Sequence, residues 1–227
     1  LRRQRQMCIR DRKSLVSSFG IVLKNRRYVY YVLQMGFAMG VLFANISSSP
    51  FIVQQHYGFS AFEFSLFFGI NALAIGLAAG LSVKFKNPEH AMFLGSVGMT
   101  MMSAVEFVIL SNEYHFAVYE AVLFVLLFSM GLTFTASTTL AMDCERANSG
   151  TASALFGAAG FAFGGIVSPL VGLGDILSTT GLIFFVCSVC SLCFSVLAMN
   201  QTHTNLWGSF KCKMGPVTRF VFLRREK

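Results

Sequence analysis

Two carboxyl side chains, Glu106 and Glu120, stand inside long runs of apolar residues. Ionisable residues within membrane segments are costly and often form proton or cation sites. A carboxyl group in an apolar setting can bind and release protons near neutral pH. Asn71 lies near the middle of another apolar run, where an amide needs a hydrogen-bonding partner or water. These residues point to proton exchange. Each residue also has a simpler interpretation. Glu120 could reach water at a membrane surface, and Glu106 could pair with another side chain for structural reasons or extend to that surface. Asn71 could bond to a hydroxyl group on another helix.

Metal and enzyme chemistry find little support. Cys187, Cys190 and Cys193 are spaced by three, so each step rotates the thiol by about −60° around a helix and the three do not converge. The four histidines are scattered near ends and loops, and no nucleophile–base pair or phosphate-binding glycine loop is present. We therefore predict no metal site, no cofactor, no disulfide and no enzymatic activity.

The composition is that of a membrane protein. Of 227 residues, 55% are hydrophobic and 12% are charged, whereas soluble domains carry about 25% charged residues. The net charge of +8 could suggest nucleic-acid binding, but the basic residues lie at the chain ends and in two short connections. A nucleic-acid-binding protein concentrates them on one folded surface. We therefore expect a lipid bilayer, and no nucleic acid, as a partner.

Six apolar segments are each about long enough to cross a bilayer as a helix, which needs about 20 residues. They predict an all-α membrane domain over residues 28–198, with spans near 28–48, 61–83, 90–110, 115–141, 149–172 and 177–198. The connections around 49–60, 111–114 and 173–176 contain no Lys or Arg, whereas the other connections and both ends do. Because cytoplasmic loops carry the positive excess, both termini are predicted to be cytoplasmic.

The two ends of the chain differ from the domain between them. Residues 1–12 are basic and lack the apolar core of a signal peptide, and we interpret them as a non-native leader. Residues 13–27 read as a cytoplasmic lead-in, and residues 199–227 as a cytoplasmic basic tail.

Two stretches resemble the Bcr/CflA (bicyclomycin-resistance-like) drug:proton antiporters of the major facilitator superfamily. The first resembles the junction of that family's seventh and eighth helices, and its matching residues include Ser49, Pro50, Phe51, Tyr57 and Gly58. The second, residues 150–172, resembles the eleventh helix. The resemblance covers about residues 25–199, and the chain departs from the family pattern at Asn45 and at residues 142–145.

The resemblance implies the C-terminal six helices of a twelve-helix transporter, with the N-terminal half as a missing partner. It makes the first, second, fourth and fifth segments the seventh, eighth, tenth and eleventh helices. Glu120 then lies on a cavity-lining helix and Glu106 on a supporting helix, and both are candidates for proton coupling. Candidate contacts along the substrate pathway are Gln34, Phe37, Asn45, Asn71, Phe124, Phe128, Ser129 and Thr133.

Small residues form two stripes at helical spacing, in the second and fifth segments. Such stripes let another backbone approach closely in lipid. With the resemblance, they are expected to face the missing half of the transporter. Their glycines are Gly69, Gly76, Gly80, Gly150, Gly157, Gly160 and Gly164.

The resemblance thus implies proton-coupled multidrug efflux by alternating access, with a small amphipathic substrate, in a bacterial inner membrane. Two alternatives stay open at this point. One is a major facilitator carrier for a metabolite such as an amino acid or a sugar acid, and the other is a six-helix membrane scaffold that transports nothing.

Overall fold

The computed structural model describes the backbone of residues 19–213 and the side chains of residues 19–201. The described part is all-helical, and six of its helices are long and apolar enough to cross a membrane, as predicted. The long helices are α2 (Arg26–Pro50), α3 (Ala61–Ser82), α4 (Pro88–Ser111), α5 (Phe116–Cys144), α6 (Ser149–Leu170) and α7 (Ile176–Lys213). Three short elements, η1 (Phe51–His56), η2 (Arg146–Asn148) and η3 (Val171–Leu173), lie between them.

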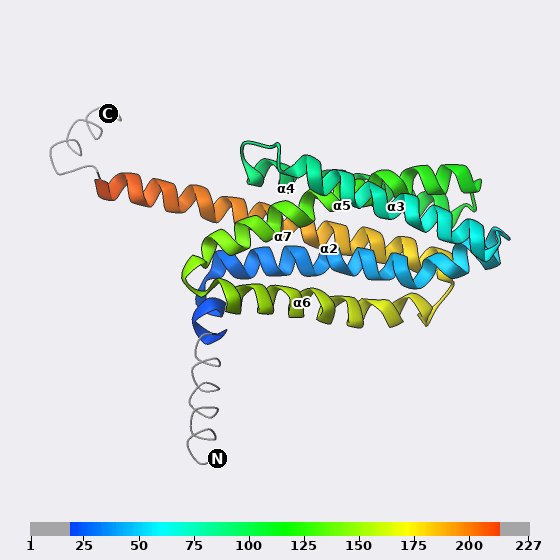
Figure 1. Cartoon of the computed structure of the whole chain (residues 1–227), viewed down its shortest axis with the longest axis horizontal. Helices are drawn as coiled ribbons and strands as arrows, with labels where there is room; N and C mark the ends of the chain where they lie inside the picture. Colours follow the sequence, from blue (N-terminus) through cyan, green and yellow to red (C-terminus); the bar gives the residue numbers. More distant parts are fainter. Residues whose placement is uncertain (1–18, 214–227) are drawn as a thin grey trace, which may run out of the picture.

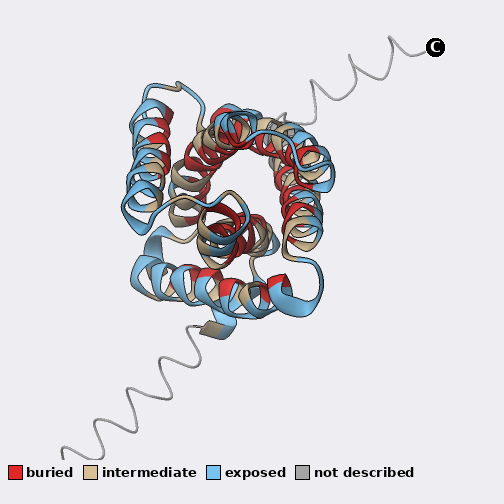
Figure 2. Ribbon diagram, turned by 90° about the vertical axis from the view of Figure 1, so that its right-hand side faces the viewer, coloured by how far each residue is buried: buried red, intermediate tan, exposed pale blue. Residues whose placement is uncertain are grey.

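The six long helices lie side by side along the long axis of the molecule (Figure 1). α2 packs against α6, α7 and α5, while α4 packs against α5 and α7. α3 packs mainly against α5, and only 17% of its apolar window is buried, compared with 56% for α5. Viewed along the helices, buried residues lie where the helices face one another and exposed residues lie on the perimeter (Figure 2). α3 is therefore held mainly through α5.

The two ends of the bundle differ in charge. The first residues of α2, the connection between α3 and α4, and η2 lie at one end, here called the basic end (Figure 1). It carries Arg26, Arg27, Lys84, Lys86 and Arg146. The opposite end carries η1 and the connections 112–115 and 174–175, which contain no Lys or Arg. The side of the membrane that each end faces stays a prediction.

The helix ends follow local capping chemistry. The Asn25 side chain accepts from the Tyr28 backbone N–H at the start of α2. Ser60 and Glu63 form a reciprocal capping box at the start of α3. Each cap satisfies backbone donors that have no partner within the first helical turn.

The first span is longer than predicted. It was expected to end near residue 48, but the chain stays helical through Pro50 and continues as the π-helix η1 to His56. Proline has no N–H and interrupts the α-helical ladder, and the next turn takes the wider form, in which the Tyr57 N–H donates to the Ile52 carbonyl at 3.1 Å. Gly58 then ends the helix at φ +76°, a left-handed conformation that favours glycine.

Several glycines lie where two helices approach most closely. A Cβ added at Gly131 of α5 would lie 2.5 Å from the Ile75 carbonyl oxygen of α3. One at Gly95 of α4 would lie 2.7 Å from the Ser129 carbonyl oxygen of α5. One at Gly181 of α7 would lie 2.9 Å from the Phe107 Cα of α4. These contacts are of the kind that small residues permit between membrane helices.

The glycines singled out from the sequence lie on different faces. Gly160 and Gly164 of α6 are buried against Met39 and Phe43 of α2, within this bundle. The remaining members of the two stripes are exposed, and no atom lies within 4 Å of a Cβ added at Gly69, Gly76, Gly80, Gly150 or Gly157. The fifth-segment stripe is therefore divided between a contact inside the bundle and an open face.

Both chain ends extend past the described side chains. The predicted non-native leader and the start of the lead-in lie outside the described residues, and residues 19–24 are helical. The backbone of α7 continues to Lys213. The rest of the predicted basic tail lies outside the described residues.

Candidate functional site

Two of the three polar residues with which the sequence analysis begins, Asn71 and Glu120, contact each other. The Asn71 Nδ2 of α3 donates to the Glu120 Oε1 of α5 at 2.9 Å. Asn71 is 5% exposed and Glu120 is half-buried. The remaining oxygens, Asn71 Oδ1 and Glu120 Oε2, are buried without a hydrogen-bond partner. Glu120 is therefore held by an amide on another helix and does not extend freely into surface water.

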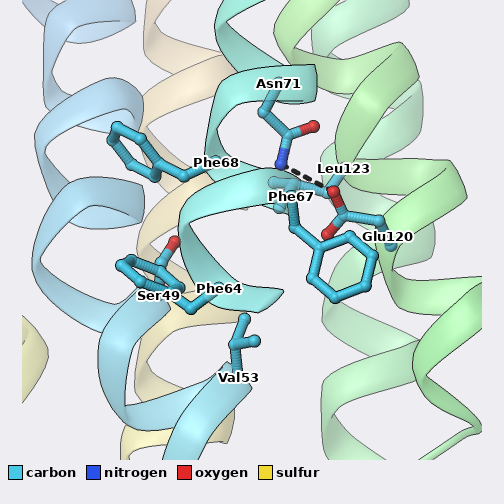
Figure 3. A pocket seen from close by; sticks show the side chains of 8 residues that line it. All are labelled: Ser49, Val53, Phe64, Phe67, Phe68, Asn71, Glu120 and Leu123. Atoms are coloured by element: carbon cyan, nitrogen blue, oxygen red, sulfur yellow. Dashed lines mark hydrogen bonds between the residues drawn. The ribbon is translucent and has the colours of Figure 1, made fainter. Parts of the chain in front are cut away.

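This pair lines a small pocket between α2, η1, α3 and α5 (Figure 3). Ser49 and Val53 form one wall, and the other lining residues are Phe64, Phe67, Phe68 and Leu123. The pocket holds about 190 Å³ of empty space, including an opening to solvent. Sites for drug-sized ligands are roughly 300–1,000 Å³. The enclosed part of this pocket is only about 10 Å³, about enough for one water molecule, and it presents one carboxyl and one amide among aromatic rings.

Glu106 of α4 is not among the residues that line this pocket. It is 0% exposed, and neither carboxylate oxygen has a hydrogen-bond partner. Among the described residues, Glu106 therefore has no hydrogen-bonded partner and does not reach the surface of the bundle. Glu106 and Glu120 are close enough to interact electrostatically, and Tyr119, also 0% exposed, interacts with both.

Tyr57 links this region to the end of the bundle opposite the basic end. Its ring centroid lies 5.8 Å from that of Tyr119, and its hydroxyl donates to the Tyr114 carbonyl oxygen at 2.9 Å. Burial raises the pKa of the Tyr57 hydroxyl, and the carboxyls of Glu106 and Glu113 raise it further. Tyr57 is thus a partly buried residue between the surface and the buried carboxyls.

Gln34 of α2 belongs to a second polar layer, nearer the basic end. Its Nε2 donates to the Ser191 Oγ of α7 at 3.1 Å, and its Oε1 accepts from the Ser137 Oγ of α5. All three residues are 0% exposed. The structure places Gln34 in a contact that joins three helices, away from the pocket.

Three other predicted contacts are satisfied within or between helices. The Asn45 Oδ1 accepts from the Ser49 Oγ at 2.9 Å, one turn further along α2. The Ser129 Oγ donates to the Val125 carbonyl oxygen at 2.9 Å, and the Thr133 Oγ1 to the Met92 carbonyl oxygen at 3.4 Å. None of the three lines the pocket.

The aromatic lining differs from the one expected. Phe37 lies between Phe163 of α6 and Phe194 of α7, with ring centroids at 4.9 and 5.7 Å. Phe124 and Phe128 are partly exposed and do not line the pocket. The rings that do, Phe64, Phe67 and Phe68, were missed. The signal that could have found them is their spacing of three, four and seven residues from Asn71, which favours the same side of α3.

Residues 19–201 hold no group of three or more His, Cys, Asp or Glu that could bind a metal ion. Within that range Cys144, Cys187, Cys190 and Cys193 are free thiols. The site is thus built from carboxyl, amide and phenol groups between apolar helices.

The six membrane-length helices define a class, the multi-pass membrane proteins. The chain belongs to the Major Facilitator Superfamily, whose sequence profile matches residues 3–169. It is a transporter-family protein, and this class of carriers is non-enzymatic. It is similar to the uncharacterized MFS-type transporter YdgK of Bacillus subtilis (strain 168), with 34% identity over 195 residues. The match covers 84% of this chain and 48% of YdgK, so the chain spans about half the length of this relative.

Proposed function

We propose that this chain forms half of a proton-coupled exporter of small amphipathic molecules in a bacterial cytoplasmic membrane. The exporter would be an antiporter of the Bcr/CflA type, in which Glu120 couples proton binding to substrate binding. The observation that carries the proposal is the bond from Asn71 to Glu120, which places a half-buried carboxyl in an aromatic-lined pocket.

Charge supports this role for Glu120. Among residues 19–201, only the amide of Asn71 is bonded to the Glu120 carboxyl group, and no Lys or Arg of this range lines the pocket. A proton or a polar substrate group can therefore compensate the negative charge of Glu120, and the two can compete for it. Phe64, Phe67 and Phe68 supply apolar contact for a range of substrates.

Alternating access supplies the movement. In transporters of this architecture one helical bundle rocks against the other around a site near the midplane. The open faces of α3 and α6, with Gly76 and Gly157 exposed, suit contact with a second bundle. Rocking would then expose Glu120 alternately to the two sides of the membrane.

The test uses the product of the complete gene, reconstituted in lipid vesicles with ethidium as the transported dye. We expect a protonophore to abolish dye accumulation. Glu120→Gln keeps the acceptor for Asn71 but cannot exchange a proton, so accumulation should fall by roughly 10²-fold or more, as when a positioned proton-transfer group is lost.

The matched control is Asp143→Asn, which neutralises an exposed carboxyl at the basic end. Asp143 forms a surface pair with Arg146 at 3.0 Å, a type of contact that contributes little stability. The Asp143→Asn variant should transport ethidium like the wild type. Dye accumulation that survives the protonophore, or that is unchanged in Glu120→Gln, would show that Glu120 does not couple protons.

A further inference from the structure

The polar side chains of the pocket leave hydrogen-bond acceptors without partners. Asn71 and Glu120 line the pocket, and the Asn71 Nδ2 donates to the Glu120 Oε1 at 2.9 Å. Their other oxygens, Asn71 Oδ1 and Glu120 Oε2, are buried and have no hydrogen-bond partner among residues 19–201. Asn71 is only 5% exposed. Buried polar groups normally have partners, so these free acceptors indicate a ligand that donates hydrogen bonds.

The third polar residue of the lining has the same bias. The Ser49 Oγ donates to the Asn45 Oδ1 at 2.9 Å, so its hydrogen is engaged and its lone pairs remain for the pocket. The other lining residues, Val53, Phe64, Phe67, Phe68 and Leu123, are apolar. The lining therefore favours a donor over an acceptor.

The charge of the ligand follows from the charges of the walls. Within the described chain, α3, α5 and the part of α2 after Arg27 contain no Lys, Arg or His, and His56 of η1 does not line the pocket. A buried carboxylate is strongly disfavoured unless it is paired. A cationic group would neutralise Glu120, whereas an anionic group would meet a like charge and no cation. The walls therefore select against acidic substrates.

The size of the enclosed space restricts the cationic group. The space has room for about one water molecule. A primary ammonium group is about this size, and it carries three N–H donors and no acceptor. A trimethylammonium group is larger and has no N–H. Phe64, Phe67 and Phe68 border the space (Figure 3), and aromatic faces attract ammonium cations.

We propose that the pocket binds the protonated primary amine of an amphipathic substrate, with the Glu120 Oε2 as the charged acceptor. The inference rests on the proposed function, because it names the class of molecule that the exporter carries. Asn71 is a positioning residue, which holds the Glu120 Oε1 and leaves Oε2 for the ammonium group. The apolar part of the substrate lies against the phenylalanines. A proton that binds to Glu120 removes the charge on which the amine depends, so the proton and the amine compete for one carboxyl group.

The test measures binding to the complete gene product in detergent by titration calorimetry, at neutral pH and without a proton gradient. The probes are phenethylamine, its trimethylammonium analogue and phenylethanol, which share one phenethyl group. Phenethylamine should bind roughly tenfold or more tightly than either of the others, because only it offers a charged donor to a carboxylate. Equal binding of phenethylamine and the trimethylammonium analogue, or of phenethylamine and phenylethanol, would overturn the inference.

A variant assigns the preference to Glu120. Glu120→Gln keeps the acceptor for Asn71 but removes the charge, so it should lower phenethylamine affinity by about tenfold or more and leave phenylethanol affinity nearly unchanged. The matched control is Glu113→Gln, because Glu113 is an exposed carboxyl in the connection between α4 and α5. It should bind all three probes like the wild type. A preference for phenethylamine that persists in Glu120→Gln would overturn the inference, as would an equal loss of affinity for phenylethanol.

The binding test and the transport test fail independently. If phenethylamine is preferred but ethidium accumulation survives a protonophore, the coupling role of Glu120 is wrong and the amine site stands. If accumulation depends on the proton gradient and on Glu120 but the three probes bind alike, the amine site is wrong and the proposed function stands.

Discussion

The contact between Gly131 and Ile75 offers a direct test of how α5 positions α3. In Gly131→Ala the new Cβ would lie 2.5 Å from the Ile75 carbonyl oxygen and 3.0 Å from the Ile75 Cα. Both are backbone atoms, so no side-chain rotation can relieve the contact. Ordinary van der Waals contact begins at 3.4 Å. Because packed helices tolerate little overlap, α3 and α5 must separate by up to about 0.9 Å, the difference between 3.4 and 2.5 Å.

This separation should affect both stability and transport. Overpacking costs about 1–3 kcal/mol, and alanine recovers about 1 kcal/mol relative to glycine within a helix. The net loss of stability is therefore about 0–2 kcal/mol. Ile75 lies one turn from Asn71, whose 2.9 Å bond to Glu120 would lengthen towards 3.8 Å if it followed the full separation. This bond holds the Glu120 carboxyl in the pocket. If binding needs the carboxyl in that position, loss of a hydrogen bond worth about 0.5–1.5 kcal/mol would lower pocket affinity by at most roughly two- to tenfold.

The assay compares purified Gly131→Ala and Gly76→Ala proteins by thermal unfolding and by ethidium binding. Gly76 lies on α3 as well, but no atom lies within 4 Å of a Cβ added there. The Gly76 variant should match or exceed the wild type in stability and bind ethidium normally. If Gly131→Ala unfolds at the wild-type temperature and binds ethidium equally well, close contact at Gly131 does not position Asn71.

Two further predictions concern the second polar layer and a helix cap. Gln34→Leu should lower the free energy of unfolding by about 1 kcal/mol, because it removes two interhelical hydrogen bonds that in membranes average roughly 0.6 kcal/mol each. The loss is no larger because the hydroxyls of Ser137 and Ser191 still donate to backbone carbonyls. A loss above about 3 kcal/mol would indicate a larger role for Gln34, since it exceeds a typical buried polar deletion. The pKa of Asp175 is lowered from its ordinary 3.8, mainly because its carboxylate accepts from the Ser178 backbone N–H. This cap is therefore intact above pH 3.8 and is lost as the pH falls through the lowered value. The protection of the Ser178 amide, measured relative to its intrinsic exchange rate at each pH, should fall there, and Asp175→Asn should remove that pH dependence.

The sequence predicted the helical framework well because each span satisfies a local requirement. A helix that crosses the bilayer must be apolar over about 20 residues, and this property is visible in any window of the chain. The exception is the first span, which was expected to end near residue 48 but stays helical through Pro50 to His56. Tertiary contacts hold Ile52 and Val53 at 0% and 3% exposure and keep the chain helical beyond the proline.

The predicted site was less complete because a side chain's environment depends on helix rotation, which composition does not reveal. Glu120 and Asn71 were selected separately for their cost in an apolar segment, and the structure joins them through one hydrogen bond. Gln34 satisfied the same criterion but lies in a contact that joins three helices. The phenylalanines of the pocket were missed because Phe is so common in this chain that no single one stands out.

The sequence by itself determined that this is a membrane protein with six spanning helices and with its cations in alternate connections and at the chain ends. It could do so because hydropathy and charge are local properties of the chain. Only the tertiary structure decided which polar residues meet, which glycines lie inside the bundle, and that Glu106 is completely enclosed. These outcomes depend on the rotation and spacing of neighbouring helices. The rotation and spacing are fixed by contacts between residues far apart in sequence, such as the contact of Gly131 with Ile75.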